Sequence, residues 1–318
     1  MVKCNSYKEN LAAAPKEIAI DNIDNNTKYN LIVETSTNYK IPCYFSPPIL
    51  PTSDEVFTSH ELDLFDNKLI VFLSAVGIYR GENTIFHRIS WSEHINQACL
   101  YIDDPGRLTS KFAPSYFIGT ENSYLIDDII KLILKFANIY KIKNNNIIFV
   151  SSSNGGFASL KLANLIPTSI CFSFCPQFSI PIYLNNRYTF FKQKFIDNKS
   201  KLRHCPELNL EIFDDNSSYY YIFSNLASSV DFAQIQFLQE KLSVNLNNKI
   251  VKINNVKLIT YTVDTKNINP HMVQPGEFEF ISLLYSNNLL NISNVMLESL
   301  CNHIKHFWLL QDRLKDNS

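Results

Sequence analysis

The sequence predicts an α/β protein with a mostly parallel sheet covered by helices on both faces. Short apolar runs with the length of buried strands alternate with stretches in which apolar residues recur at helical spacing. The 318 residues are 46% hydrophobic and only 19% charged, a composition that can bury a large core. No internal repeat and no Pro-, Gly- or Ser-rich linker divides the chain.

The first third of the chain departs from this alternation. Two runs, Tyr29–Glu34 and Lys40–Phe45, look like antiparallel strands of a leading sheet edge or of a small appended module. A turn-rich stretch with three prolines follows over residues 46–54. We therefore expect an N-terminal β-rich segment, residues 1–60, packed on an α/β domain over residues 61–318.

Six apolar runs of the larger domain are expected as strands, with helical patterns between and after them. The expected strands are Leu69–Leu73, Cys99–Ile102, Asn146–Val150, Ser169–Phe174, Tyr219–Phe223 and Lys257–Val263. The expected helices are Ser123–Tyr140, Phe157–Leu165, Phe232–Leu242, Glu279–Tyr285 and Leu297–Arg313. Residues 177–215, aromatic and basic, interrupt this order, so we expect an insertion over the C-terminal edge of the sheet, where open α/β folds bind ligands.

The turn after the strand Asn146–Val150 has the pattern of a nucleophile elbow, with Ser153 at the nucleophile position. Gly155 stands two residues after it, and Ser151, two residues before it, replaces the usual glycine with another small residue. Two of only seven glycines, Gly155 and Gly156, fall in this turn. The alternative is an ordinary Ser-rich turn with a glycine helix start, which many α/β proteins contain, phosphate-binding ones among them.

A serine nucleophile needs a base and an acid, which follow it in the order acid, then His, after later strands. Asp231 and His271 occupy these places. The imidazole takes the hydroxyl proton, and the carboxylate fixes its tautomer and stabilises its charged form. Asp264, in the same loop as His271, is the rival acid. The alternatives are that Asp231 only stabilises a helix N-terminus and that His271 is a solvated loop residue.

Two backbone N–H groups would form an oxyanion hole. Asn154, directly after Ser153, supplies one, and Ala75, in the loop after the strand Leu69–Leu73, is the best candidate for the other. The neighbouring loop contains Arg88 and Trp91, which we take as candidate contacts for an anionic or sugar substrate. The alternative for this loop is a solvated segment with the Trp packed beneath it.

Composition excludes several other classes of function. A net charge of −1 leaves no basic surplus for a nucleic acid or an anionic membrane. Seven scattered cysteines fit neither a disulfide framework nor a zinc ribbon, so we expect reduced thiols and assign no metal. The first 15 residues lack an apolar leader, and no run reaches about 18 apolar residues, so we expect a soluble, cytoplasmic protein without a membrane span.

With these residues in view, the chain resembles the α/β-hydrolase superfamily, and within it the serine-dependent O-acetyltransferases of capsular and other surface polysaccharides. The resemblance covers residues 68–285 and rests on Val150–Ala158, the loop Phe86–Trp91, Asp231 and His271. It implies an α/β-hydrolase-like domain in which an acetyl group passes from acetyl-CoA to the nucleophilic serine and then to a sugar hydroxyl. Acetyl-CoA would be a co-substrate, and no bound cofactor is implied.

The leading hypothesis is therefore a serine acyltransferase acting on a polysaccharide or oligosaccharide acceptor. The runner-up is a serine esterase or thioesterase, in which water resolves the acyl-enzyme. The residues do not separate the two, because transfer depends on water exclusion and acceptor affinity. A third hypothesis is a catalytically silent scaffold in polysaccharide assembly or secretion. The acceptor, the acyl donor and a homo-oligomeric state are left open.

Overall fold

The computed structural model describes residues 13–36, 39–48, 67–75, 86–106, 116–120, 123–185, 217–247, 250–286 and 289–316, together with residues 11 and 189. Of the expected insertion at 177–215, residues 186–188 and 190–215 lie outside the described residues. Its first part holds the short helix α6 (Ile180–Leu184).

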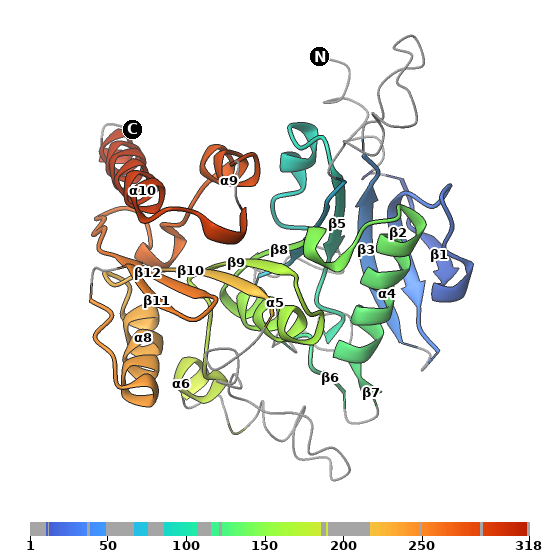
Figure 1. Cartoon of the computed structure of the whole chain (residues 1–318), viewed down its shortest axis with the longest axis horizontal. Helices are drawn as coiled ribbons and strands as arrows, with labels where there is room; N and C mark the ends of the chain where they lie inside the picture. Colours follow the sequence, from blue (N-terminus) through green and yellow to red (C-terminus); the bar gives the residue numbers. More distant parts are fainter. Residues whose placement is uncertain are drawn as a thin grey trace.

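A ten-stranded sheet crosses the molecule (Figure 1). Its six central strands are parallel and lie in the order β5 (Ala98–Ile102), β4 (Leu69–Leu73), β8 (Ile147–Ser152), β9 (Ile170–Phe174), β10 (Tyr219–Asn225) and β12 (Val256–Tyr261). All six coincide with expected strands to within a few residues at their ends. The mostly parallel α/β architecture is confirmed.

Both edges of the sheet add strands of mixed direction. On one side follow β3 (Lys40–Ser46), β2 (Tyr29–Glu34) and β1 (Lys16–Ala19). β3 is antiparallel to β5 and to β2, whereas β1 is parallel to β2. On the other side β11 (Ile250–Ile253), which the sequence did not predict, forms an antiparallel pair with β12. The strands of the N-terminal segment thus continue the main sheet. A separate two-stranded sheet consists of β6 (Gly119–Thr120) and β7 (Ser123–Tyr124).

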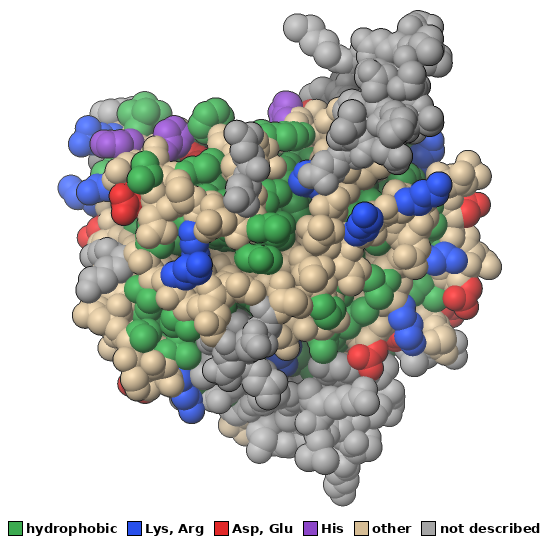
Figure 2. Space-filling model, viewed as in Figure 1, with side chains coloured by type: hydrophobic (Ala, Val, Ile, Leu, Met, Phe, Trp, Pro, Cys, Tyr) green, Lys and Arg blue, Asp and Glu red, His purple; other side chains and the backbone are tan. Residues whose placement is uncertain are grey.

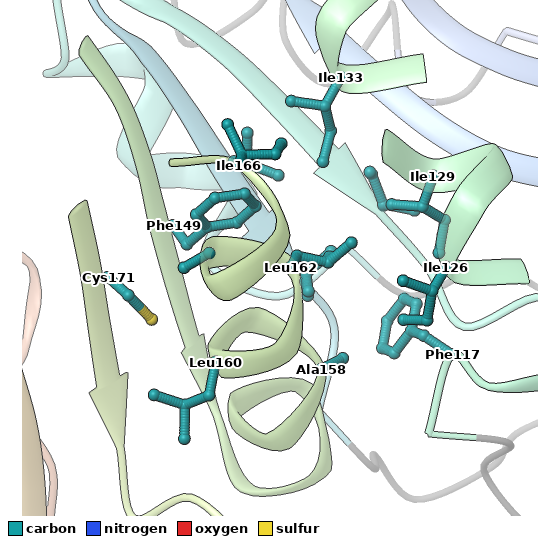
Figure 3. Close-up of a cluster of buried hydrophobic side chains, with 14 of the residues drawn as sticks. Phe117, Ile126, Ile129, Ile133, Phe149, Ala158, Leu160, Leu162, Ile166 and Cys171 are labelled. Carbon is teal, nitrogen blue, oxygen red and sulfur yellow. The ribbon is translucent and has the colours of Figure 1, made fainter. Parts of the chain in front are cut away.

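Helices cover both faces of the sheet. The cluster of buried side chains on one face includes residues from α4 (Leu125–Ile139), α5 (Ser153–Leu165) and α8 (Ser229–Leu242). The cluster on the other face includes residues from the 3-10 helix η2 (Ile89–Glu93), from α9 (Glu277–Leu284) and from α10 (Asn294–Asp316). Figure 3 shows side chains of α4 and α5 directed into the space between these helices and the sheet.

The strand β4 illustrates how one apolar run serves both faces. Leu69, Val71 and Leu73 point into the first cluster. Ile70 and Phe72 point into the second. Because side chains alternate along a strand, an uninterrupted apolar run fits a strand buried on both sides.

One boundary differs in a way that matters for the site. The helix expected from Phe157 begins four residues earlier, at Ser153. Ser, Asn and Gly are weak helix formers, so the local sequence did not predict this first turn. This first turn instead packs closely against the end of β4 at Gly155 and against β9 and Pro176 at Gly156.

The distribution of charged side chains on the surface agrees with the net charge of −1. On the face shown in Figure 2, Lys and Arg side chains are scattered and do not gather into one patch. Among the described helices, none has both the length and the apolar character needed to cross a bilayer.

Candidate active site

The turn between β8 and α5 holds Ser153 in a backbone conformation that L residues rarely adopt. Its φ angle is 53°, in the left-handed region, and only 6% of its surface is exposed. Such residues persist where the surrounding structure fixes them, and they cluster at active sites. This is the sharp strand-to-helix turn that the elbow motif requires.

Small residues around Ser153 let the chain turn this tightly. A Cβ atom on Gly155 would lie 2.8 Å from the carbonyl oxygen of Leu73. A Cβ atom on Gly156 would lie 2.8 Å from the Cβ atom of Pro176, two residues after β9. Ser151 stands where the motif usually has glycine. Its Oγ accepts a hydrogen bond from the Leu73 N–H at 3.2 Å, so its side chain ties β8 to β4.

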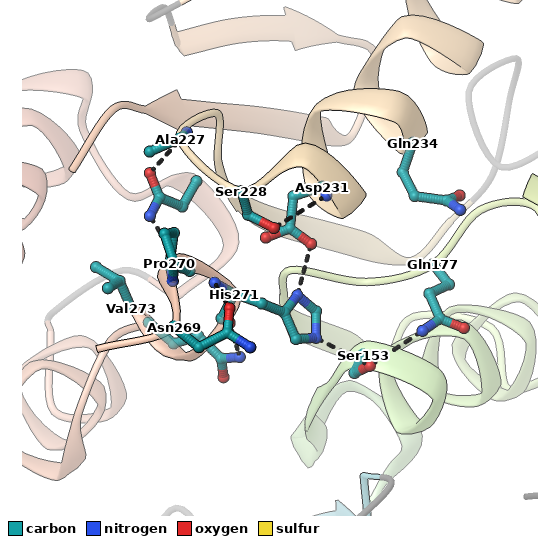
Figure 4. Close-up of polar contacts among 12 residues, drawn as sticks. Ser153, Gln177, Ala227, Ser228, Asp231, Gln234, Asn269, Pro270, His271 and Val273 are labelled. Carbon is teal, nitrogen blue, oxygen red and sulfur yellow. Dashed lines mark hydrogen bonds and ion pairs between the residues drawn. The ribbon is translucent and has the colours of Figure 1, made fainter. Parts of the chain in front are cut away.

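Three side chains from distant parts of the chain form one hydrogen-bonded series (Figure 4). His271 Nε2 lies 3.1 Å from Ser153 Oγ, and His271 Nδ1 lies 2.7 Å from Asp231 Oδ1. Ser153 follows β8, Asp231 lies in the first turn of α8 after β10, and His271 lies in the 3-10 helix η6 (Pro270–Met272) after β12. The parallel strands bring these three chain segments to the same edge of the sheet.

The loop that carries His271 is held by amide side chains. Asn225, the last residue of β10, donates to the carbonyl oxygens of Val263 at 3.0 Å and of Pro270 at 2.9 Å. The Oδ1 atom of Asn269 accepts a hydrogen bond from the His271 N–H at 3.0 Å. The sequence analysis did not identify these supports, because no motif marks an Asn at the end of a strand.

Asp231, and not the rival Asp264, lies next to the histidine. Asp231 is 1% exposed, whereas Asp264 is an exposed residue. The backbone N–H of Asp231 donates to the capping hydroxyl of Ser228 at 3.3 Å, so the carboxylate is also a first-turn helix residue. Burial raises the pKa of the Asp231 carboxyl above its ordinary value, and the hydrogen bond from His271 opposes that rise.

Gln177 is a site residue that sequence reasoning missed. It is 1% exposed, its Nε2 donates to Ser153 Oγ at 3.1 Å, and its backbone N–H donates to the Ser153 carbonyl oxygen at 3.2 Å. Gln234 of α8 holds the next residues, because its Oε1 accepts two backbone N–H groups at 2.7 and 2.8 Å. Only the position of Gln177 after β9, the strand beside β8, signals its role.

A pocket of about 350 Å³ opens beside Ser153. Its walls include His271 and three residues that the sequence singled out, Ala75, Arg88 and Trp91. A larger hollow of about 680 Å³ lies between β12 and α10. The larger hollow is lined by no Ser–His pair, so the smaller pocket is the candidate site.

Solved structures of other proteins have a fold similar to that of this chain. The capsule O-acetyltransferase of Neisseria meningitidis serogroup A matches with a TM-score of 0.51 and 13% identity, over 78% of this chain and 94% of that chain. A mutant of that acetyltransferase in complex with CoA matches with a TM-score of 0.53 and 12% identity, over 84% of this chain and 100% of that one. The chain has an α/β-hydrolase-like fold.

A hydrolase shares the same architecture. The fluorophosphonate-binding serine hydrolase F of Staphylococcus aureus matches with a TM-score of 0.51 and 12% identity, over 76% of this chain and 92% of that chain. No protein-family model matches the sequence, and no curated protein matches it at the sequence level. The α/β-hydrolase-like fold of this chain is thus one that both acyl-transferring and hydrolytic enzymes use.

The two backbone groups expected to hold an oxyanion differ in their surroundings. Asn154 is 1% exposed and lies in the first turn of α5, where backbone N–H groups point toward the N-terminal end of the helix. Ala75 lines the pocket, but its N–H donates to His87 Nδ1 at 3.1 Å. An oxyanion at Ala75 would therefore have to replace His87 as the acceptor.

The two candidate substrate contacts, Arg88 and Trp91, lie at different depths in the pocket wall. Trp91 is only 8% exposed and packs on the rings of Phe280 and Phe72, with centroids 5.5 and 6.0 Å away. The guanidinium carbon of Arg88 lies 5.2 Å from the Trp91 ring centroid. The guanidinium of Arg88 thus rests on the buried ring of Trp91.

One group of described residues has the composition of a metal site. Ligand atoms of Cys175, Asp231 and His271 lie within 4.8 Å of one another. Burial raises the pKa of the Cys175 thiol well above its ordinary value, which disfavours the thiolate that metals bind. The facing atoms of Asp231 and His271 already bond each other, so they are not free to bind a metal ion together.

Proposed function

We propose that the protein is a serine-dependent acyltransferase that moves an acetyl group from acetyl-CoA to a sugar hydroxyl of a bacterial surface polysaccharide. The observation that carries the proposal is the continuous hydrogen-bonded series from Asp231 through His271 to Ser153. A base bonded to the hydroxyl, and itself oriented by a buried carboxylate, is the arrangement that activates a serine nucleophile.

In the first half-reaction Ser153 Oγ attacks the thioester carbonyl carbon while its proton passes to His271 Nε2. Asp231 stabilises the imidazolium that forms, since its carboxylate accepts the Nδ1–H. Backbone N–H groups of Asn154 and Ala75 stabilise the oxyanion of the tetrahedral intermediate, a contribution of roughly 3 to 4 kcal/mol per donor. The C–S bond then breaks, and the CoA thiolate leaves with the proton from His271.

In the second half-reaction an acceptor hydroxyl attacks the acetyl group on Ser153. His271 takes the hydroxyl proton, a second tetrahedral intermediate forms, and the bond from the acetyl carbon to Ser153 Oγ breaks. The proton returns to Ser153 Oγ, and the acceptor leaves as an acetate ester. When water is the acceptor, the same steps release acetate and the enzyme is an esterase or thioesterase.

Two observations support transfer from acetyl-CoA. The structures similar to this chain include a capsule O-acetyltransferase, one of them in complex with CoA. The pocket of about 350 Å³ beside Ser153 has room for more than an acetyl group, as a second substrate requires. The similarity to a serine hydrolase keeps hydrolysis as the alternative.

The test is incubation of the purified protein with acetyl-CoA, followed by intact mass and free CoA. We expect the wild-type protein to gain one acetyl group and to release CoA, and Ser153→Ala to do neither. The matched control is Ser282→Ala on α9, whose hydroxyl bonds only the carbonyl oxygen of Phe278 among the described residues. This control is expected to behave like the wild type.

Acceptors separate the two enzymatic hypotheses. CoA release that increases with added oligosaccharide, with an acetylated product, supports transfer. Release that is independent of the oligosaccharide supports a thioesterase. If neither acetyl-CoA nor an aryl acetate ester gives a Ser153-dependent adduct or product, the enzymatic proposal is wrong, and a silent scaffold in polysaccharide assembly or secretion is favoured.

A further inference from the structure

The pocket beside Ser153 contains a guanidinium that is held in place by neutral groups. Arg88 Nη2 donates to Gln274 Oε1 at 3.0 Å, and its two terminal nitrogens lie 3.3 and 3.4 Å from Ser152 Oγ. The guanidinium also lies over the rings of Trp91 and Phe174, at 5.2 and 5.5 Å from their centroids. These contacts orient the side chain without neutralising it.

No carboxylate among the described residues compensates this charge. None of the ion pairs between them involves Arg88. Burial lowers the pKa of the guanidinium to about 10, so it stays charged at neutral pH. The groups whose charge would favour the cation are Cys175 and Tyr101, and burial raises the pKa of each well above its ordinary value. Both are therefore neutral at neutral pH, so no anionic group of the described residues lies beside the cation.

The backbone at Arg88 is also unusual. Its φ and ψ angles are 63° and 18°, a left-handed conformation that residues other than glycine rarely adopt. Residues held in such conformations cluster at active sites and ligand-binding segments. A half-buried guanidinium that lines a pocket, with no ion pair among the described residues, is available to an anion that enters the pocket.

We propose that Arg88 binds a carboxylate or phosphate group that the acceptor carries close to its reacting hydroxyl. The guanidinium fork matches such groups, because it presents parallel N–H donors to two oxygens. The inference rests on the proposed function for the identity of the acceptor, and it narrows that acceptor from any sugar to an acidic one.

Position within the pocket argues for the acceptor over the donor. Arg88 contacts Ser152, the residue directly before Ser153, so an anion bound there lies near the reacting carbonyl. In acetyl-CoA the long pantetheine arm separates the phosphates from the thioester, and the acetyl group has no charge. The remaining substrate group that can carry an anion near the reaction centre is the acceptor.

Gln274 connects this subsite to the base. Its Oε1 accepts from Arg88, and its Nε2 donates to the His271 carbonyl oxygen at 2.9 Å. A bound anion that fixes Arg88 would therefore also fix the segment that carries His271. Acceptor binding and alignment of the base are coupled through one amide side chain.

The first test measures binding with the Ser153→Ala protein, which needs no turnover. Titrations followed by NMR would compare glucose with glucuronate and with glucose 6-phosphate, so that the two arms distinguish a carboxylate from a phosphate. We expect at least one anion to bind roughly tenfold or more tightly than glucose, the preference that a charge-assisted bidentate contact gives. In a protein that also carries Arg88→Gln, the preference is expected to fall to roughly twofold or less.

Two further variants serve as a second substitution at Arg88 and as a control. Arg88→Lys retains the charge but not the fork, so an intermediate preference is expected, and it tests the site even if Arg88→Gln folds poorly. Arg313→Gln removes an exposed guanidinium from the last turn of α10 and should leave the preference unchanged. Equal affinity for glucose and both anions, or a preference that survives Arg88→Gln, would overturn the proposal.

The second test measures transfer. We expect the ratio of kcat/KM for the preferred acidic acceptor to that for glucose to fall about tenfold in Arg88→Gln. An equal loss on charged and neutral acceptors would overturn the proposal and assign Arg88 a general role in catalysis. If no acyl-enzyme forms at all, the proposed function fails, whereas the binding test still decides whether the anion subsite exists.

Discussion

The two sides of Ser153 treat buried charge in opposite ways. On one side Asp231 and His271 face each other at 2.7 Å, so the carboxylate has a partner that becomes positive when the serine is deprotonated. On the other side Arg88 is surrounded by Ser152, Gln274 and two aromatic rings. The first side is a carboxylate–imidazole pair closed within the protein, whereas no ion pair among the described residues includes the cation on the second side.

This difference separates the residues proposed to carry out the reaction from the residue proposed to select the substrate. The Asp231–His271 pair acts on any substrate that reaches Ser153, because Asp231 stabilises the imidazolium that forms during the reaction. The positive charge of Arg88 is balanced only when a bound ligand supplies a negative charge. Removing a group on the first side should therefore affect all substrates alike, and removing Arg88 should affect them according to their charge.

The largest effect is expected on the paired side. His271→Ala removes the acceptor of the Ser153 hydroxyl proton, so kcat for acyl transfer or ester hydrolysis should fall by about 10⁴-fold or more with every substrate. His94→Ala is the matched control, because exposed His94 also bonds a carboxylate, Glu277 at 2.6 Å, but no serine. Equal losses in both variants would contradict the assignment of His271 as the base.

The choice between the two acids gives the next effect. Asp231→Asn should lower kcat by about 10³- to 10⁴-fold, because the imidazole loses the group that fixes its tautomer. Asp264 is exposed, and the carboxylate that bonds His271 is that of Asp231, so Asp264→Asn should retain wild-type activity. Steady-state kinetics with an aryl acetate ester measures both. A large loss in Asp264→Asn alone would reverse the assignment.

A smaller effect is expected at Gln177. Gln177→Ala removes one hydrogen bond to Ser153 Oγ, worth about 1 kcal/mol, so the rate of acyl-enzyme formation should fall roughly five- to tenfold. Burst kinetics resolves this step from deacylation. Exposed Gln236 on α8 offers the control Gln236→Ala, and a thermal melt of each variant separates a lost contact from lost stability. An unchanged acylation rate would show that the contact has no role in catalysis.

The smallest effect concerns stability and pH. Burial raises the Asp231 pKa above its ordinary value of 3.8, so the folded state binds this proton more tightly than the unfolded state. Asp231 therefore stabilises the fold less as pH rises from 3.8 through its raised pKa. The free energy of unfolding of Asp231→Asn, relative to the wild type, should increase with pH across this window and then level off. Urea unfolding at several pH values measures it, and a difference that falls with pH would contradict the shift.

Local patterns in the sequence predicted the six central strands, β2, β3, most helices and the strand-to-helix turn at Ser153, but not the edge strand β1 or the short pair β6 and β7. The strands β4, β8 and β9 are short apolar runs, which their length and composition identify directly. The first turn of α5 was missed because Ser153, Asn154 and the two glycines are poor helix formers held by packing. The edge strand β11 was missed because its burial is only partial and its apolar signal is weak.

What the sequence determined by itself is therefore the order of the elements and the residue types at their ends, since short-range periodicity and turn chemistry encode both. Tertiary structure decided which side chains meet. The site bonds of Ser153 to His271 and to Gln177 span 118 and 24 residues, and Arg88 reaches Gln274 across 186. No local pattern encodes contacts of that range, because they depend on the lateral order of strands in the sheet. The same order places Arg88 beside Ser152, where no described carboxylate forms an ion pair with it.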